Sequence, residues 1–138
     1  MPTVDSGMNV DGFEAHGGWI ASAADLVRFA AHFDRPEGPT LLNPDSVATM
    51  FERPTGETGN VWYACGWQVR TAGPNGRGRN TWHGGLLVPG TSTLLVRRWD
   101  GLSWAVLFNT HSNPKGEILA NLIDSPLHEA SDAVAHWP

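Results

Sequence analysis

The sequence predicts an α+β fold in which an antiparallel sheet of about four strands packs with helices. Helical patterns occupy both ends of the chain, strand-like runs fill the middle, and short connections join the strands. With 138 residues, of which 41% are hydrophobic, the chain has enough material to bury one core. We therefore expect residues 1–138 to form a single domain.

Residues 1–16 contain Gly, Asp and Asn with little periodicity, and we expect a loop or a segment trailing from an upstream part. The first helix is predicted after Ser22, because Asp25 follows three residues later and approximates a capping box. Its apolar face comprises Leu26, Phe29, Ala30 and Phe33. A second, short helix is predicted after Asn43, since Pro44 suits the first helical position. Its inward residues are expected to be Val47, Met50 and Phe51.

Four strand-like runs follow, at about 61–71, 79–85, 91–99 and 102–110. A Gly-rich stretch at 73–78 separates the first two, and Asp100-Gly101 predicts a tight turn between the last two. Residues 104–108 show no polar alternation, which is typical of a strand buried on both faces. We expect helices on both sides of the sheet, with this chain covering one face.

The end of the chain reads as helix again, over 115–124 and 126–136. Pro126 is expected to restart or kink this helix, because proline lacks the N–H that a helix interior needs.

Composition excludes several classes of function. The net charge of −5 argues against nucleic acid and anionic membranes as partners. No apolar run reaches the ~20 residues of a membrane span, and the first residues show no charged-then-apolar signal pattern. The six His show no zinc-ligand spacing, and the lone Cys65 reads as a small buried side chain. We predict no metal and no cofactor. The seven Trp are expected to serve mainly the core.

His83 is the main candidate for chemistry. It precedes Gly84 and Gly85 in a strand, and paired glycines suggest that a ligand or another backbone approaches closely. A histidine there can donate a hydrogen bond or a charge to an anionic group, and neighbouring backbone N–H groups can stabilise an oxyanion. A structural histidine at a bulge explains the same residues equally well.

Several segments, in order, resemble one family. They are Gly17-Gly18-Trp19-Ile20-Ala21-Ser22 with Asp25-Leu26, Tyr63-Ala64-Cys65-Gly66-Trp67, His83-Gly84-Gly85 with Pro89-Gly90-Thr91-Ser92, and Ala105-Val106-Leu107-Phe108-Asn109. They are similar to blocks of β-lactamase-related proteins, the branch of class C β-lactamases, D,D-carboxypeptidases (penicillin-binding proteins) and esterases. The resemblance implies that residues 17–138 form the C-terminal half of the β-lactamase/D,D-peptidase (transpeptidase-like) fold.

The resemblance also implies roles. In this family a serine attacks an acyl carbon and forms an acyl-enzyme. His83 would orient the substrate and its carboxylate, and Leu86 would lend its backbone N–H to the oxyanion hole. Gly84 and Gly85 would let substrate lie alongside the strand. Asn109 and Asn113 are candidates for facing a substrate carboxylate, although capping the C-terminal helix is an equal alternative. The implied substrates of a full-length parent are acyl compounds such as a β-lactam, a peptide or an ester.

The family's nucleophile and its Tyr-x-Asn motif have no counterpart in the sequence. Ser112 and Lys115 fit the Ser-x-x-Lys pattern, but they follow the last strand and enclose Pro114, so we reject them. Tyr63 is not followed by an Asn at the required place. A triad of Ser92, His83 and Asp25 can be assembled on paper, without a nucleophile elbow to support it.

We therefore expect a portion of a hydrolase that is inactive alone and either self-associates or pairs with an upstream fragment. The alternative is a non-catalytic module that binds a ligand or a protein chain.

Overall fold

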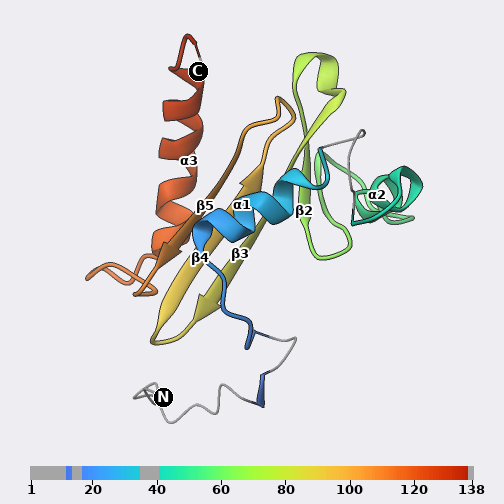
Figure 1. Ribbon diagram of the computed structural model, residues 1–138. Helices are drawn as coiled ribbons and strands as arrows, with labels where there is room; N and C mark the ends of the chain where they lie inside the picture. The colour runs from blue at the N-terminus through green and yellow to red at the C-terminus, as the bar shows by residue number, and fades with distance from the viewer. Residues whose placement is uncertain (1–11, 14–16, 35–40, 137–138) are drawn as a thin grey trace.

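The computed structural model describes residues 12–13, 17–34 and 41–136. The helices are α1 (Ala23–Ala31), α2 (Pro44–Met50) and α3 (Leu119–Asp132), and η3 (Pro74–Gly76) is a single 3-10 turn. The strands are β1 (Val61–Tyr63), β2 (Gln68–Ala72), β3 (Gly78–Leu87), β4 (Thr91–Arg97) and β5 (Ser103–Phe108). The predicted α+β class is confirmed (Figure 1). Most of the loop expected at 1–16 lies outside the described residues.

The sheet has five antiparallel strands in the order β1-β2-β3-β4-β5, so strands adjacent in sequence are adjacent in space. The expected number of about four was too low because the run at 61–71 folds back on itself. Gly66 adopts a φ of +75°, which glycine reaches without steric cost. The Ala64 N–H then donates to the Trp67 carbonyl at 2.8 Å and closes the turn between β1 and β2.

Both predicted helix starts are confirmed. Ser22 Oγ accepts from the Asp25 N–H at 3.2 Å, and Asp25 Oδ2 accepts from the Ser22 N–H at 3.1 Å, which completes a capping box. These hydrogen bonds, those with Ser22 foremost, hold the pKa of Asp25 below its usual range. Asn43 Oδ1 caps α2 by accepting from the Ser46 N–H at 2.8 Å.

The last helix differs from its prediction. It begins at Leu119 rather than near 115, because Asn113 holds residues 113–117 in a turn. It continues through Pro126 without a restart and ends at Asp132. The hydroxyl of Ser131 donates to the Leu127 carbonyl at 2.6 Å in its last turn.

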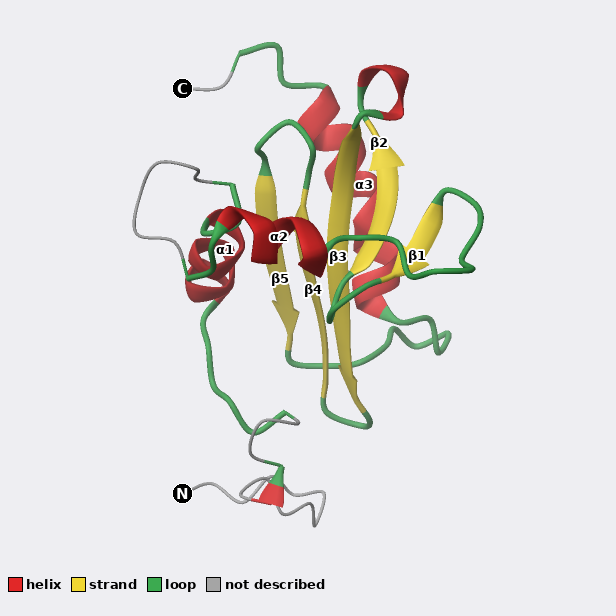
Figure 2. Cartoon of the chain, turned by 90° about the vertical axis from the view of Figure 1, so that its right-hand side faces the viewer, coloured by secondary structure: helices red, strands yellow, loops and turns green. Residues whose placement is uncertain are grey.

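Helices cover both faces of the sheet, so the expectation that this chain covers one face was wrong. Leu95 packs in a core cluster with α1 and α2, whereas its strand neighbours Leu94 and Val96 pack on the other face against Ala120 of α3. Successive side chains of a strand point to opposite faces, which produces this division. Figure 2 shows α1 and α2 in front of the sheet and α3 behind it.

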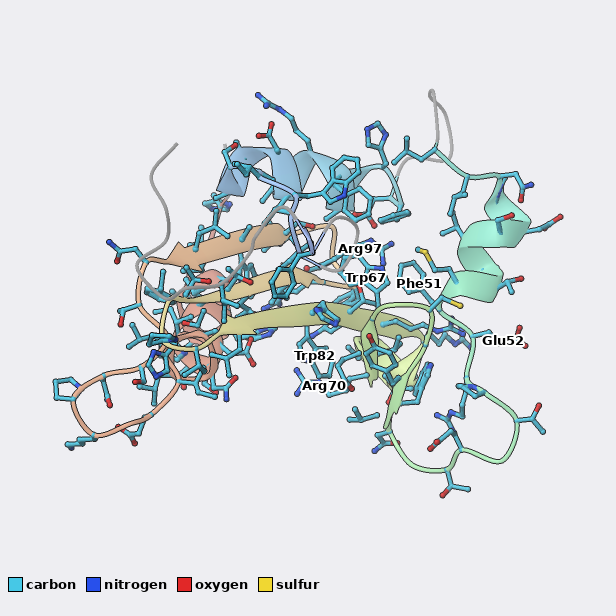
Figure 3. All side chains as sticks on the ribbon, turned by 90° about the horizontal axis from the view of Figure 1, so that it is seen from below. Phe51, Glu52, Trp67, Arg70, Trp82 and Arg97 are labelled. Carbon is cyan, nitrogen blue, oxygen red and sulfur yellow. The ribbon has the colours of Figure 1, made fainter. Side chains whose placement is uncertain are left out.

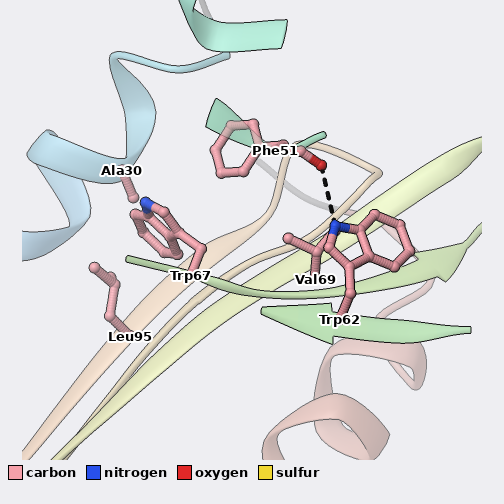
Figure 4. Packing of buried hydrophobic residues seen from close by; sticks show 6 residues of the cluster. All are labelled: Ala30, Phe51, Trp62, Trp67, Val69 and Leu95. Atoms are coloured by element: carbon pink, nitrogen blue, oxygen red, sulfur yellow. Dashed lines mark hydrogen bonds between the residues drawn. The ribbon is translucent and has the colours of Figure 1, made fainter. Parts of the chain in front are cut away.

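Aromatic rings fill the first face. Trp67 contacts the rings of Phe29, Phe33 and Phe51 at centroid distances of 6.0 to 6.4 Å. Trp62 donates its Nε1–H to the Phe51 carbonyl at 3.3 Å (Figure 4). The prediction that tryptophans serve the core is confirmed for these two, which are each 5% exposed, while Trp19 is 84% exposed.

Candidate active site on the open edge of β3

Part of β3 has a free edge. The pairing of β2 with β3 ends at Gln68 opposite Trp82, whereas β3 continues to Leu87 and pairs with β4 all along that length. Within the part of the chain that the structure describes, residues 83–87, which contain the candidate site, therefore have a strand neighbour on one side only. A free strand edge presents unpaired N–H and C=O groups to an incoming chain.

Hydrogen bonds at the β1–β2 end show which backbone groups face which strand. The Thr71 N–H donates to the Asn60 carbonyl at 3.1 Å, and the Trp67 carbonyl accepts from Ala64. Odd-numbered residues of this segment thus direct their backbone groups to β1. Because consecutive residues of a strand alternate in direction, Gln68 and the other even-numbered residues of β2 direct theirs to β3.

The same alternation continues into β3. Trp82 pairs with Gln68 and faces β2, so Gly84 and Leu86 face the same edge, beyond the end of β2. The pairing of β4 with β5 gives the same result. The backbone N–H of Arg98 donates to the Leu102 carbonyl at 2.8 Å, so the even-numbered residues of β4 direct their backbone groups to β5. Odd-numbered residues of β4 face β3 and pair with His83, Gly85 and Leu87. Gly84 and Leu86 therefore carry the N–H groups for which the described residues provide no strand partner.

His83 stands where the free edge begins. Its Nε2 lies 3.2 Å from the phenol oxygen of Tyr63, and the two rings are tilted by 60° with centroids 6.1 Å apart. His83 pairs across the strands with Leu95, which places its side chain on the face that carries α1 and α2. Both Tyr63 and His83 are exposed, so they are accessible to a ligand.

Different surroundings explain why positions 84 and 85 are both glycine. A Cβ at Gly85 would lie 2.5 Å from Thr93 Oγ1 on β4, so packing within the chain requires glycine there. Among the described residues, a Cβ at Gly84 would meet only the Thr93 carbonyl oxygen, at an ordinary 3.5 Å. Packing within the chain does not explain the glycine at 84. This position keeps the strand slim on the face that carries α3.

A hollow of about 440 Å³ lies beside Gly84, between β3 and α3. Its lining comprises Gln68, Trp82, His83, Gly84, Leu94, Ala120, Asn121 and Asp124. The guanidinium of Arg70 lies 5.7 Å from the Trp82 ring centroid. Figure 3 shows Trp82 and Arg70 on this side of the sheet and Trp67 and Phe51 on the other.

The two asparagines lie away from His83. Asn109 follows the end of β5, whereas His83 is level with Ala105 of that strand, with β4 in between. Asn113 Oδ1 accepts from the N–H groups of Lys115 and Glu117 at 2.9 and 3.0 Å. Its side chain thus orders the turn before α3. A substrate-binding role for Asn109 and Asn113 stays a prediction.

Other serine candidates do not meet His83. Ser92 is fully buried and donates to the Thr110 carbonyl at 3.2 Å, and it alternates with Leu95 onto the opposite face from His83. The triad of Ser92, His83 and Asp25 is therefore not assembled. Ser112 and Lys115 lie in the turn before α3 rather than at a helix start.

A cluster of charged side chains lies elsewhere, where α3 meets the β4–β5 turn. Arg98 binds Asp100 at 2.7 Å and Asp132 at 2.6 Å. The bond to Asp100 foremost raises the pKa of Arg98. Burial foremost raises the pKa of Asp100, but the hydrogen bonds from Arg98 and from the Leu102 N–H, together with the charge of Arg98, outweigh it, and the net shift is downward. This cluster fastens α3 to the sheet.

Within the described ranges, three or more His, Cys, Asp or Glu side chains nowhere gather closely enough to hold a metal ion. In the same part of the chain, none of the helices has the length and apolarity to cross a membrane.

The family model described as Beta-lactamase matches residues 1–126. The chain therefore belongs to the β-lactamase family, and its α+β architecture fits a serine-hydrolase-like fold. Comparisons with curated proteins and with solved structures find no match.

In the sequence, Tyr63 opens the segment Tyr63-Ala64-Cys65-Gly66-Trp67 of the family resemblance and fails the Tyr-x-Asn pattern, but nothing in the sequence predicts its contact with His83. Their separation of 20 residues carries no local signal. The contact depends on the turn at Gly66, which folds β1 beside β2 and so brings Tyr63 near the end of the β2–β3 pairing.

Proposed function

We propose that this chain supplies one wall of the active site of a serine β-lactamase-like hydrolase, which acts through an acyl-enzyme on amide or ester bonds. The observation that carries the proposal is the free edge of β3, where the N–H groups of Gly84 and Leu86 point outward directly after His83. An acyl substrate lies along this edge like an added strand. The acyl-enzyme chemistry is inferred from the family resemblance, and the free edge of β3 provides the surface along which the substrate lies.

Each residue has a role in this proposal. The Leu86 N–H donates to the oxygen of the substrate carbonyl, which becomes negative during acylation. His83 orients the substrate through its carboxylate. Gly84 keeps the strand free of a side chain where the substrate approaches. Asn109 and Asn113, which lie beyond β5, are retained as more distant candidates for a substrate carboxylate.

The nucleophile comes from a segment outside this chain, which carries Ser-x-x-Lys and Tyr-x-Asn. The chain is thus the C-terminal portion of the catalytic unit and is inactive alone. Incubation with a fluorescent penicillin and with a fluorophosphonate tests this directly. We expect no covalent mass shift, and a label mapped to a serine of this chain, Ser112 above all, would overturn the proposal.

Reconstitution tests the role of Leu86. The chain is combined with a segment, encoded upstream in the same reading frame, that carries Ser-x-x-Lys. Acylation by the pair should be lost in Leu86→Pro, which removes an N–H that the sheet does not use. Leu86→Ala keeps the N–H and is the matched control. Equal acylation by the two variants would remove Leu86 from the oxyanion hole.

The second candidate is a non-catalytic module, favoured by the fact that a free strand edge binds an extended chain without any nucleophile. Under this alternative the acyl probes fail with every upstream segment, while extended peptides still bind. Peptide binding that is weakened by charge on the edge, with no acylation under any condition, would select the module over the hydrolase.

The proposed partner is therefore either the upstream fragment or a second copy of this chain, in addition to the acyl substrate. Unpaired strand edges support both.

A further inference from the structure

We infer that Tyr63 is a positioning residue for His83, which holds the imidazole in the tautomer that carries its proton on Nδ1. The inference rests on the proposed function for its purpose, because the tautomer matters to a bound carboxylate. Its main test does not depend on catalysis.

Tyr63 and His83 lie close enough to form a hydrogen bond. Tyr63 Oη lies 3.2 Å from His83 Nε2, within hydrogen-bond range, and the described structure gives neither side chain another hydrogen bond. Tyr63 ends β1 and His83 continues β3 just past its last residue paired with β2. The contact thus joins two strands that are not direct neighbours, at the point where the free edge begins.

The phenol of Tyr63 and the imidazole of His83 have complementary hydrogen-bonding groups. The phenol O–H of Tyr63 can donate a hydrogen bond, and its oxygen can accept one. When His83 is neutral, the phenol donates to the lone pair on Nε2. The imidazole proton must then lie on Nδ1, because a neutral ring has one N–H and one acceptor nitrogen.

The tautomer decides what His83 offers to a substrate. With Nε2 engaged by Tyr63, Nδ1–H is a donor, which suits a carboxylate or a carbonyl oxygen. Without Tyr63, the neutral ring can place its proton on Nε2 and present an acceptor at Nδ1, which repels a carboxylate. When His83 is protonated, its Nε2–H donates to the phenol oxygen and Nδ1–H stays a donor. Nδ1 is therefore a donor in both charge states, and Tyr63 is needed for this only when the ring is neutral.

Long-range ¹H–¹⁵N spectra of the labelled chain test the inference at a pH where His83 is neutral, with His83→Gln to assign its signals. We expect the Nε2 resonance in the region of an acceptor nitrogen. In Tyr63→Phe it should move toward the region of a protonated nitrogen. Val61→Thr is the matched control, since Val61 lies on the same strand and is similarly exposed, at 46% against 51%. It should leave the His83 signals in place.

Two results would overturn the inference. One is a neutral His83 in the unsubstituted chain with its proton on Nε2. The other is a Tyr63→Phe variant with unchanged His83 signals and a native amide spectrum. The first result is measured on the unsubstituted chain, so the inference can be tested even if Tyr63→Phe does not fold.

Activity separates this inference from the proposed function. In a reconstituted hydrolase, Tyr63→Phe should raise KM for substrates with a carboxylate and should have no further effect in a His83→Gln background. If the tautomer shift is observed but no upstream segment restores acylation, the proposed function fails and the role of Tyr63 stands. If acylation is restored but the tautomer does not respond, the reverse holds.

Discussion

Arg98 and Asp132 form an ion pair of 2.6 Å that joins the β4–β5 turn to the last turn of α3, across 34 residues of sequence. The Arg98 side chain is 8% exposed and also binds Asp100, and its Nη1 lies 3.2 Å from His128 Nδ1. An arginine always donates, so His128 Nδ1 must accept. The docking of α3 therefore depends on a charged residue at the sheet and on an uncharged histidine.

Replacing Arg98 should loosen this docking. Arg98→Met is expected to lower the free energy of unfolding by roughly 2 kcal/mol, because it leaves two aspartates without their charged hydrogen-bond donor. Arg28→Met is the matched control, since the Arg28–Asp25 pair is well exposed and should contribute little. Urea unfolding followed by tryptophan fluorescence measures both. Equal losses in the two variants would contradict the docking role.

His128 should make stability depend on pH. Burial foremost, together with the charges of Arg98 and Arg70, lowers its pKa in the folded protein, although Asp124 and Asp132 oppose the shift. The Trp104 ring packs against it at 4.9 Å. The folded state therefore resists protonation more than the unfolded chain does. The contribution of His128 is present above about pH 6.5 and is lost as the pH falls below that value.

The measurement is the free energy of unfolding between pH 7 and pH 5. His128→Gln should flatten its fall with decreasing pH. The same change at the exposed His136 controls for the loss of one histidine. An unaltered pH dependence in His128→Gln would remove this residue as the cause.

Gly85 and Thr93 should show energetic coupling. Gly85→Ala is expected to cost about 1–3 kcal/mol, because the new Cβ meets Thr93 Oγ1 at 2.5 Å. Thr93→Ala removes that atom, so the double variant should be more stable than the sum of the single changes predicts. Gly84→Ala is the control and should be tolerated by the fold, since its Cβ has room. Additive losses would show that the Oγ1 contact does not determine the glycine at 85.

The edge of β5 should promote association of the isolated chain. Alternation from Leu102 directs the backbone groups of Ser103, Ala105 and Leu107 away from β4, and the described residues provide no strand beyond them. This strand has no charged residue or proline to discourage pairing. We expect light scattering to show oligomers whose fraction rises with concentration and falls in Leu107→Lys. A monomer mass across a wide concentration range would contradict this expectation.

Local chemistry explains which parts of the fold were predictable. The capping residues Ser22 and Asn43 and the turn at Asp100-Gly101 act within a few residues, and the structure confirms all three. The sequence predicts a single strand at 61–71 because its apolar pattern continues through the residues that form the turn between β1 and β2. The start of α3 was placed too early because the hydrogen bonds of Asn113 compete with helix formation at 113–117.

The candidate site was predictable only in part. The residues His83, Gly84, Gly85 and Leu86 were selected from the sequence, and the structure places all four on β3. The sequence pattern cannot distinguish Gly84 from Gly85. A Cβ at Gly85 would collide with the Thr93 side chain on the neighbouring strand, whereas a Cβ at Gly84 would not. Nor can it pair Tyr63 with His83.

The sequence by itself determined the family, the α+β class, the caps of α1 and α2 and most of the strand segments, because periodicity and capping are properties of short stretches. The tertiary structure alone decided that β2 ends beside Trp82, that Gly84 and Leu86 direct their N–H groups to a free edge, and that Tyr63 reaches His83. These features depend on the register between strands. Register is fixed by the packing of Leu95 and Val96 against helices on opposite faces, which joins parts of the chain that are distant in sequence.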